Sequence, residues 1–285
     1  MLRLVLPILA LLVMTPVRAD TVQLTLPNAL VATAEYWQGD SDKPVVLVLH
    51  GFLQTYHFPT VYRLSEGLYS EGYSVLAPSL TLGVTYRRQS LACEAIHTHT
   101  LEQDLAEIGA WIDWLKAHGH TAIILSGHSA GSLELLAYVA GNPDPAIRQF
   151  VGVSIIEGRF ELSDSELAAL QADLGQRIAR HDRSLVRQQF SFCTRMLATP
   201  ASLYSYLSWT PEHILAAAHD ARIPVSFIVG SKDERLGADW IRRLRATGRE
   251  VHVIEGANHF MDGEHEFDLL DTVLAVISEE QKPSP

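Results

Sequence analysis

The sequence lacks the features that mark membrane-spanning and nucleic-acid-binding proteins. The mostly apolar run over residues 4–14 is too short to cross a bilayer, for which a helix needs about 20 residues. Basic side chains are few: the 285 residues include 22 Lys and Arg against 33 Asp and Glu, a formal net charge of −11. This balance argues against nucleic acid, which requires a cationic surface, and against docking to anionic lipid.

The start of the chain instead has the pattern of a secretory signal peptide. Arg3 precedes the apolar run, and the light residues Val17 and Ala19 stand where a signal peptidase cuts. We expect residues 1–19 to be removed, with no cysteine near the cut to carry a lipid, and the protein to be periplasmic or extracellular. An uncleaved membrane anchor is the alternative. Cleavage removes Arg3 and Arg18 and leaves 20 basic and 33 acidic side chains, a charge of −13.

Cysteine is scarce, since the chain has only Cys93 and Cys193. In an exported protein this pair predicts an intramolecular disulfide that closes a loop of about 100 residues and stabilises the fold by about 4–5 kcal/mol. Two unrelated buried thiols are the alternative. A catalytic cysteine is disfavoured because neither residue lies in a nucleophile turn or beside a predicted base.

The most informative motif is G-x-S-x-G around Ser129. The apolar run 123–125 leads into it, and the helix-forming segment 132–138 follows it. This order predicts a strand, a sharp turn and a helix, in which the turn holds the serine in a strained conformation and presents its Oγ. Gly127 and Gly131 stand where a side chain would block the close approach of strand and helix.

Two further residues follow in a matching order. Asp233 comes after the predicted buried strand 224–230, and His259 comes after the predicted strand 250–254. With their G-x-x-D and G-x-N-H-F contexts, they make the chain resemble the α/β-hydrolase superfamily over nearly all of its mature length. The resemblance implies that Ser129 is the nucleophile, that His259 takes and returns its proton, and that Asp233 orients the imidazole.

Three residues compete for these roles. Glu157 ends the strand before Asp233 and is the rival acid, but the position after the penultimate strand is the usual acid site, which favours Asp233. His252 and His265 compete with His259, although the first lies within a predicted strand and the second in a predicted helix.

The resemblance also implies an oxyanion hole of two backbone amides. One belongs to Ala130, directly after the nucleophile. The other comes from the loop after the predicted strand 44–49, where His50 and Gly51 resemble the superfamily's HG loop; Phe52 is favoured as the donor and Leu53 is the alternative. An ordinary strand-ending glycine is the other interpretation of this loop.

The remaining pattern predicts a mostly parallel, doubly wound α/β sheet, the α/β-hydrolase fold, with a helical cap insertion. Strands are expected at 22–26 and 30–37, as an opening antiparallel hairpin, and at 44–49, 73–77 and 149–156 besides those already given. Helices are expected at 59–70, 100–117 and 130–140. The predicted division is a single domain, 20–285, with a core of about 20–157 and 221–278 and a cap of about 158–220.

Two segments are longer than a simple alternation of strands and helices requires. The connection 78–98 is long and leaves the carboxyl end of a strand, so it is expected beside the active site. The cap insertion is expected to hold helices at 163–180 and 184–197, and the disulfide would tie it to the long connection. Three aromatic residues follow the second helix and either line an acyl pocket or form the core of the cap: Tyr204, Tyr206 and Trp209.

Arg87 and Arg88 place two cations on the long connection of an acidic protein. They either bind a substrate carboxylate or phosphate or form a solvated surface pair, and we favour the surface pair.

Four nearby residues have metal-binding side chains: His57, Glu94, His97 and His99. The H-x-H spacing in a loop is a weak signal without a third ligand at motif spacing. Solvated loop histidines are therefore favoured, and neither a metal nor another cofactor is expected.

We interpret the chain as an exported serine hydrolase that cleaves a small-molecule carboxylic ester or thioester through an acyl-enzyme. A serine peptidase or acyltransferase is the enzymatic alternative, because the same triad serves both. A catalytically silent binding or scaffold module is the non-enzymatic alternative, against which the complete triad and both oxyanion elements argue.

Overall fold

The computed structural model describes residues 19–141, 143–158, 162–237 and 239–279. The predicted signal peptide therefore lies outside the described residues except for Ala19. No helix within these ranges is long and apolar enough to cross a membrane.

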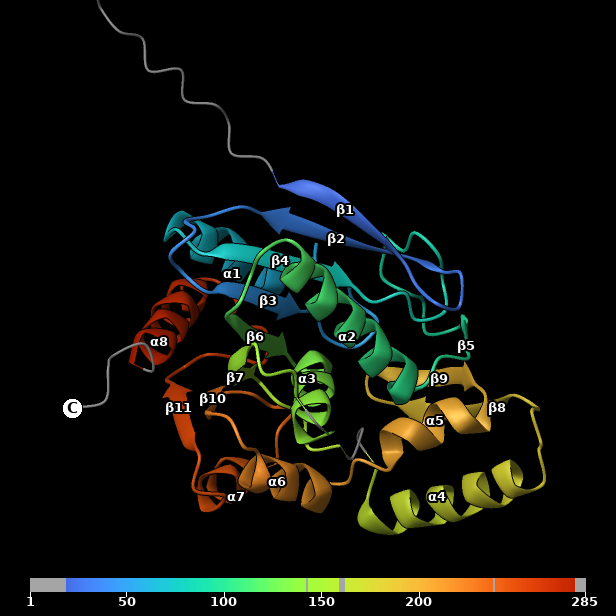
Figure 1. The fold of residues 1–285 in the computed structure, drawn as a ribbon. Helices are drawn as coiled ribbons and strands as arrows, with labels where there is room; N and C mark the ends of the chain where they lie inside the picture. Colours follow the sequence, from blue (N-terminus) through green and yellow to red (C-terminus); the bar gives the residue numbers. More distant parts are fainter. Residues whose placement is uncertain (1–18, 142, 159–161, 238, 280–285) are drawn as a thin grey trace, which may run out of the picture.

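An eight-stranded sheet forms the centre of the structure (Figure 1). In spatial order its strands are β1 (Asp20–Thr25), β2 (Val31–Trp37), β4 (Ser74–Ser79), β3 (Val45–Leu49), β6 (Ile123–His128), β7 (Ile147–Val153), β10 (Val225–Gly230) and β11 (Glu250–Ile254). Strand β2 pairs antiparallel with β1 and β4, and the other pairs are parallel. The predicted mostly parallel sheet is thus confirmed, including its opening hairpin.

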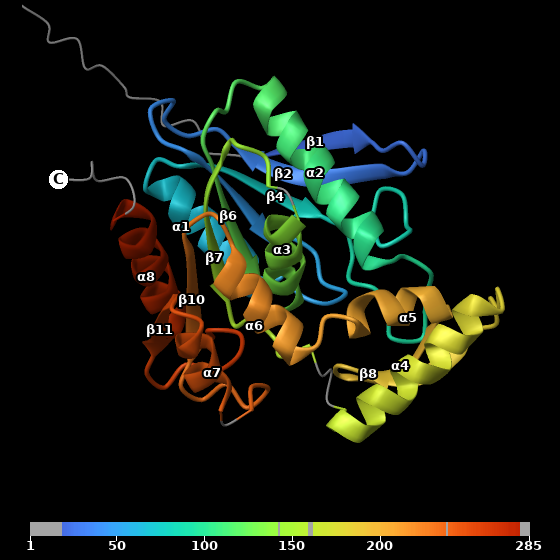
Figure 2. The same cartoon turned by 60° about the horizontal axis from the view of Figure 1, so that its bottom comes forward.

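Helices cover both faces of this sheet (Figure 2). One face carries α1 (Pro59–Ser70) and α8 (His265–Glu279), which pack against each other. The other face carries α2 (Leu101–Ala117), α3 (Ala130–Gly141) and α6 (Pro211–Asp220), while α7 (Trp240–Ala246) packs beside β11. Strand β3 is buried along its whole length because it is covered on both sides, which explains its unbroken apolar sequence.

Local signals set the starts of two helices. Pro59 stands in the first turn of α1. Amides of the first turn have no partner within the helix, so the missing N–H of proline costs no helical hydrogen bond. Thr100 and Gln103 form a capping box at the start of α2 and satisfy two amides there.

Between β7 and β10 the chain builds a smaller layer, drawn in yellow and orange in Figure 1, from α4 (Asp164–Ala179), β8 (Val186–Phe190), β9 (Cys193–Ala198) and α5 (Pro200–Leu207). Gly158 and Trp209 flank this insertion in sequence and touch in space: a Cβ on Gly158, whose φ is +71°, would collide with the Trp209 carbonyl oxygen. The chain therefore leaves the core and returns to it at one place.

The helix predicted over 163–180 is confirmed as α4, but the helix predicted over 184–197 is wrong. This segment forms the antiparallel hairpin β8–β9, and β9 also pairs in parallel with β5 (Ile96–His97) of the long connection. Arg and Gln side chains give β8 a good helix propensity, but its exposure alternates along the chain as in a half-buried strand. Pairing with a segment about 100 residues away decides the outcome.

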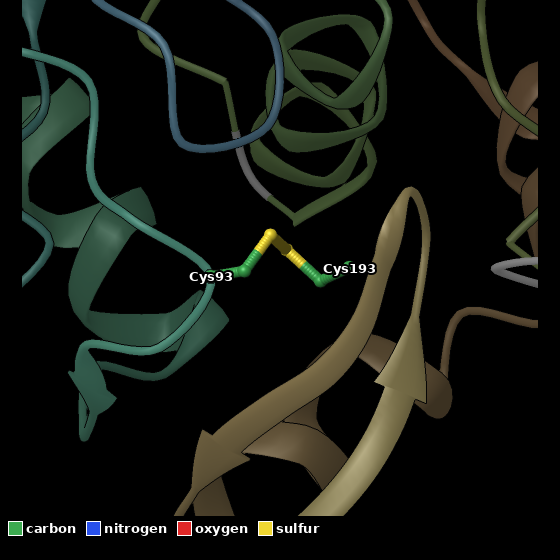
Figure 3. Close-up of a disulfide and its surroundings, with 2 residues drawn as sticks. All are labelled: Cys93 and Cys193. Carbon is green, nitrogen blue, oxygen red and sulfur yellow. A yellow bond between two sulfur atoms is a disulfide. The ribbon is translucent and has the colours of Figure 1, made fainter.

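A disulfide joins the long connection to this hairpin (Figure 3). The Cα atoms of Cys93 and Cys193 lie 5.4 Å apart, and the bond closes a loop with a sequence separation of 100 residues. The predicted pairing is confirmed. It fixes the start of β9 beside the loop that precedes β5.

Candidate active site

Ser129 stands in the turn between β6 and α3 with a φ of +56°. This left-handed conformation strains a residue that is not glycine, and such strain is typical of nucleophile turns. A Cβ on Gly127 would lie 2.6 Å from the carbonyl carbon of Gly131, and a Cβ on Gly131 would collide with the carbonyl oxygen of His50. Both glycines are therefore required for strand and helix to approach as closely as they do.

The structure brings the predicted triad together. His259 Nε2 lies 2.9 Å from Ser129 Oγ, and His259 Nδ1 lies 2.8 Å from Asp233 Oδ2. All three residues are buried, and the Asp233 side chain is only 1% exposed. Because the carboxylate accepts a hydrogen bond from Nδ1–H, Nε2 is free to accept the proton of the serine.

Two neighbours of the nucleophile that the sequence analysis did not single out hold this geometry. His128 Nε2–H donates to the carbonyl oxygen of His259 at 2.9 Å, and burial lowers the pKa of His128 to about 3, so that it stays neutral. The Ser132 hydroxyl lies 2.6 Å from the Gly127 carbonyl oxygen and 2.9 Å from that of Val153. His128 occupies a position of G-x-S-x-G that any residue can fill, so the motif by itself predicts no role for it.

The rival residues have other partners, although Glu157 lines the same pocket as Ser129. Glu157 accepts a hydrogen bond from the backbone amide of Gly237. His252 faces Glu250 on β11 at 3.6 Å, and His265 pairs with Asp268 on α8 at 2.9 Å. Asp233 is the carboxylate that contacts the candidate base.

The loop after β3 passes beside the nucleophile, since a Cβ on Gly51 would lie 3.2 Å from Ser129 Cβ. Gln54 closes this loop with two hydrogen bonds of 3.1 Å. Its backbone N–H donates to the Gly51 carbonyl oxygen, and its side-chain Oε1 accepts from the Gly51 backbone N–H. Phe52 and Leu53 lie between these two residues, and Leu53 has a φ of +58°. The backbone amides of Phe52 and Ala130 stay the predicted oxyanion donors, and Leu53 stays the alternative to Phe52.

A pocket of about 650 Å³ opens at Ser129. The core contributes Ile156 and the loop that follows Asp233. The insertion contributes Leu162, Ser163 and Ser191, the last from the turn of the β8–β9 hairpin. A substrate bound at Ser129 would thus touch both the core and the insertion.

Comparison with known proteins agrees with this geometry. A family model described as alpha/beta hydrolase fold matches residues 44–180, which include the loop after β3 and the nucleophile turn. The chain belongs to the α/β-hydrolase fold superfamily. A comparison with curated proteins gives no match.

Solved structures of this superfamily cover nearly all of the chain. Est1E from Butyrivibrio proteoclasticus, which has also been solved with ferulic acid bound, is 16% identical over 91% of this chain and 98% of its own, with a TM-score of 0.64. The thioesterase domain from the curacin biosynthetic pathway is 17% identical over 90% and 99%, with a TM-score of 0.61. The esterase EaEST from Exiguobacterium antarcticum is 14% identical over 91% and 100%, with a TM-score of 0.63. At such identities the likeness establishes the shared fold.

The prediction of a solvated surface cation is wrong for Arg87, and Arg87 does not line the pocket at Ser129, which argues against the substrate-binding alternative. The residue is 3% exposed, and its guanidinium donates to the carbonyl oxygens of Leu80, Leu53 and Gln89. Burial lowers its pKa to about 10, which leaves it charged at neutral pH. Three buried acidic residues favour its charged form, although burial raises the pKa of each of them: Glu107, Asp104 and Glu134.

Arg87 also orients His50, the residue before the oxyanion loop. His50 Nδ1–H donates to the Gly51 carbonyl oxygen at 2.8 Å, so Nε2 is an acceptor. It accepts from the Leu80 amide at 3.1 Å and from Arg87 Nη2–H at 3.0 Å. Burial, followed by the charge of Arg87, lowers the pKa of His50 to about 3 and keeps it neutral. Through these hydrogen bonds, His50 connects the oxyanion loop to Leu80 and Arg87.

Arg88 is exposed, as predicted for a surface residue, and interacts with the hydroxyl of Tyr56. It does not line the pocket at Ser129.

The prediction of solvated loop histidines is wrong for His97 and His99, which are buried. Burial lowers the pKa of both, that of His99 to about 3. His57 and Glu94 are exposed. Within the described ranges, no group of three or more His, Cys, Asp or Glu residues is placed to hold a metal ion.

The predicted aromatic stretch contributes packing away from Ser129. Tyr206 is buried and donates its hydroxyl to Asp104 of α2, while Trp209 stacks on His213 at a ring-centre distance of 4.2 Å. Tyr204 is 38% exposed. None of the three lines the pocket at Ser129, which favours the packing interpretation over an acyl pocket.

Proposed function

We propose that the protein is a serine hydrolase that cleaves a carboxylic ester or thioester through an acyl-enzyme. The observation that carries the proposal is the hydrogen-bonded chain from Ser129 through His259 to Asp233, mounted on a strained turn. The esterases and the thioesterase among the similar structures support this reaction class.

In the first half of the reaction, His259 Nε2 takes the proton from Ser129 Oγ as the oxygen attacks the carbonyl carbon. The amides of Phe52 and Ala130 stabilise the negative oxygen of the tetrahedral intermediate. The imidazolium then protonates the leaving group, and the acyl group remains on Ser129. In the second half, water gives its proton to His259 and attacks the acyl carbon; His259 then returns the proton to Ser129 Oγ as the bond to the serine breaks and the acid leaves.

The insertion serves as the cap of this site. Leu162, Ser163 and Ser191 line the pocket that contains Ser129, which supports a role in selecting the substrate. The protein acts after export, and the disulfide is consistent with an oxidising compartment. Intact-mass measurement after periplasmic expression tests export: loss of residues 1–19 is expected, and a mass that retains them contradicts it.

A fluorophosphonate probe separates a hydrolase from a catalytically silent module, because only an activated serine reacts with it. We expect labelling of the wild type and none of Ser129→Ala. A panel of p-nitrophenyl esters, acyl thioesters and aminoacyl amides then separates an esterase or thioesterase from a peptidase. Asp233→Asn should lower kcat by about 10⁴, as the corresponding change does in a serine protease, because it favours the wrong imidazole tautomer. If Glu157→Gln is the crippling change instead, the acid assignment is wrong.

A further inference from the structure

Among the residues that the structure describes, one cation at the pocket has no anionic partner. Arg235 lines the same pocket as Ser129 and follows Asp233 by two residues. Its backbone amide donates to Asp233 Oδ1 at 3.0 Å, which fixes its position relative to the triad. In the described part of the chain, no carboxylate lies within ion-pair distance of its guanidinium.

Two phenylalanine rings hold this guanidinium in place. It lies 5.0 Å from the ring centre of Phe260, the residue after the candidate base, and 5.8 Å from that of Phe192, at the tip of the β8–β9 hairpin. An aromatic face attracts a cation without accepting its in-plane N–H groups as a carboxylate does. The two rings therefore orient the guanidinium of Arg235 and leave its in-plane N–H groups available to a ligand.

Four other charged residues line the pocket, and each differs from Arg235. Glu157 accepts a hydrogen bond from the backbone amide of Gly237, and its charge, like that of Glu234, opposes the binding of an anion. Arg243 is paired with a carboxylate of α6 at 2.9 Å, and Asp239 is paired with Arg242 at 2.9 Å. Glu234 is exposed, lines the pocket and precedes Arg235 in the chain, so its charge weakens the attraction of an anion to this place.

We propose that Arg235 binds a carboxylate of the substrate, so that the preferred substrates are esters or thioesters that carry a second, ionised carboxyl group. This inference rests on the proposed function. The planar fork of a guanidinium matches a carboxylate through two parallel hydrogen bonds. The anion-binding role considered for Arg87 and Arg88 thus falls to a residue beside the triad. Because Arg235 is exposed, solvent screens its charge, and we expect a preference of about tenfold and not more than about a hundredfold.

The test compares esters that differ only in one carboxylate. On the acyl side the pair is p-nitrophenyl monoadipate and p-nitrophenyl hexanoate; on the alcohol side it is 4-carboxyphenyl hexanoate and phenyl hexanoate. The measured quantity is the ratio of kcat/KM for the anionic ester to that for its neutral partner. Arg235→Gln should lower this ratio about tenfold for one of the two pairs, and that pair identifies the side that carries the carboxylate.

Three further variants sharpen the result. Arg235→Lys, which keeps the charge and loses the fork, should retain part of the preference. Glu234→Gln should raise the ratio by about two- to threefold, since it removes an opposing surface charge. Arg245→Gln makes the same charge change as Arg235→Gln on an exposed residue of α7 that does not line the pocket, and it should leave the ratio unchanged.

The outcomes are distinguishable. If Arg235→Gln leaves the ratio unchanged for both pairs, or lowers it no more than Arg245→Gln does, the carboxylate site is refuted while the proposed hydrolase stands. If the wild type hydrolyses no ester or thioester and its Ser129 is not labelled by a fluorophosphonate, the proposed function itself fails.

Discussion

Arg87→Met tests whether a buried guanidinium holds the oxyanion loop. The change keeps most of the side-chain volume and removes the charge and every donor. Arg87 is 3% exposed and bonds to Leu80, Leu53, Gln89 and His50, so the variant leaves buried acceptors with fewer partners. It also removes the cation near three buried acidic side chains.

The expected magnitude follows from these contacts. Each buried acceptor left without its charged donor costs about 1–3 kcal/mol, so the loss of several is a large part of the about 5–15 kcal/mol by which a native domain is stable. The Leu53 carbonyl oxygen keeps a hydrogen bond from the Leu91 amide at 2.9 Å, so the loop is expected to shift and not to unfold. A shifted oxyanion donor lowers kcat by about 10² or more, with a smaller change in KM.

Urea unfolding gives the stability, and steady-state hydrolysis of a neutral ester gives kcat and KM. Arg88→Met is the matched control, because it removes the neighbouring exposed arginine and should change stability by less than about 0.5 kcal/mol. Arg87→Lys should recover more stability than kcat, since it restores the charge but not the fork. An Arg87→Met protein as stable and as active as the control would refute the positioning role.

Two further predictions follow from buried groups. Burial raises the pKa of Glu134 well above its ordinary value, so the folded state holds this proton more tightly than the unfolded state does. The carboxyl group therefore lowers the stability of the fold as the pH rises above the unfolded pKa of about 4.3. The difference in free energy of unfolding between Glu134→Gln and wild type should therefore increase from pH 4 upward, by up to about 1.4 kcal/mol per pH unit; a difference independent of pH in urea unfolding contradicts this. Replacing Cys93 and Cys193 together by Ser should lower stability by about 4–5 kcal/mol on the chain-entropy model and loosen substrate selectivity, while a fluorophosphonate still labels Ser129; unchanged thermal unfolding would show that the bond constrains little.

The two main predictions that the structure contradicts share a physical cause. The hairpin at 186–198 was predicted as a helix because its propensity is local, whereas its pairing with β5 spans about 100 residues. Arg87 was placed at the surface or at the substrate because a charged residue in a long loop is usually exposed. Its actual partners come from the loops after β3 and β4, and the sequence carries no pattern for such a cluster.

The sequence by itself determined the sheet, the nucleophile turn and the order of the triad. These features depend on short-range signals: unbroken apolar runs for buried strands, two glycines around Ser129, and chemistry-bearing residues directly after strands. Parallel strands bring their carboxyl ends to one edge, so this order was enough to place Ser129, Asp233 and His259 together. The tertiary structure alone decided which charges are buried and which are free. It enclosed Arg87 among carbonyl oxygens and left Arg235 between two aromatic rings, because burial and pairing depend on what distant segments bring to the same place.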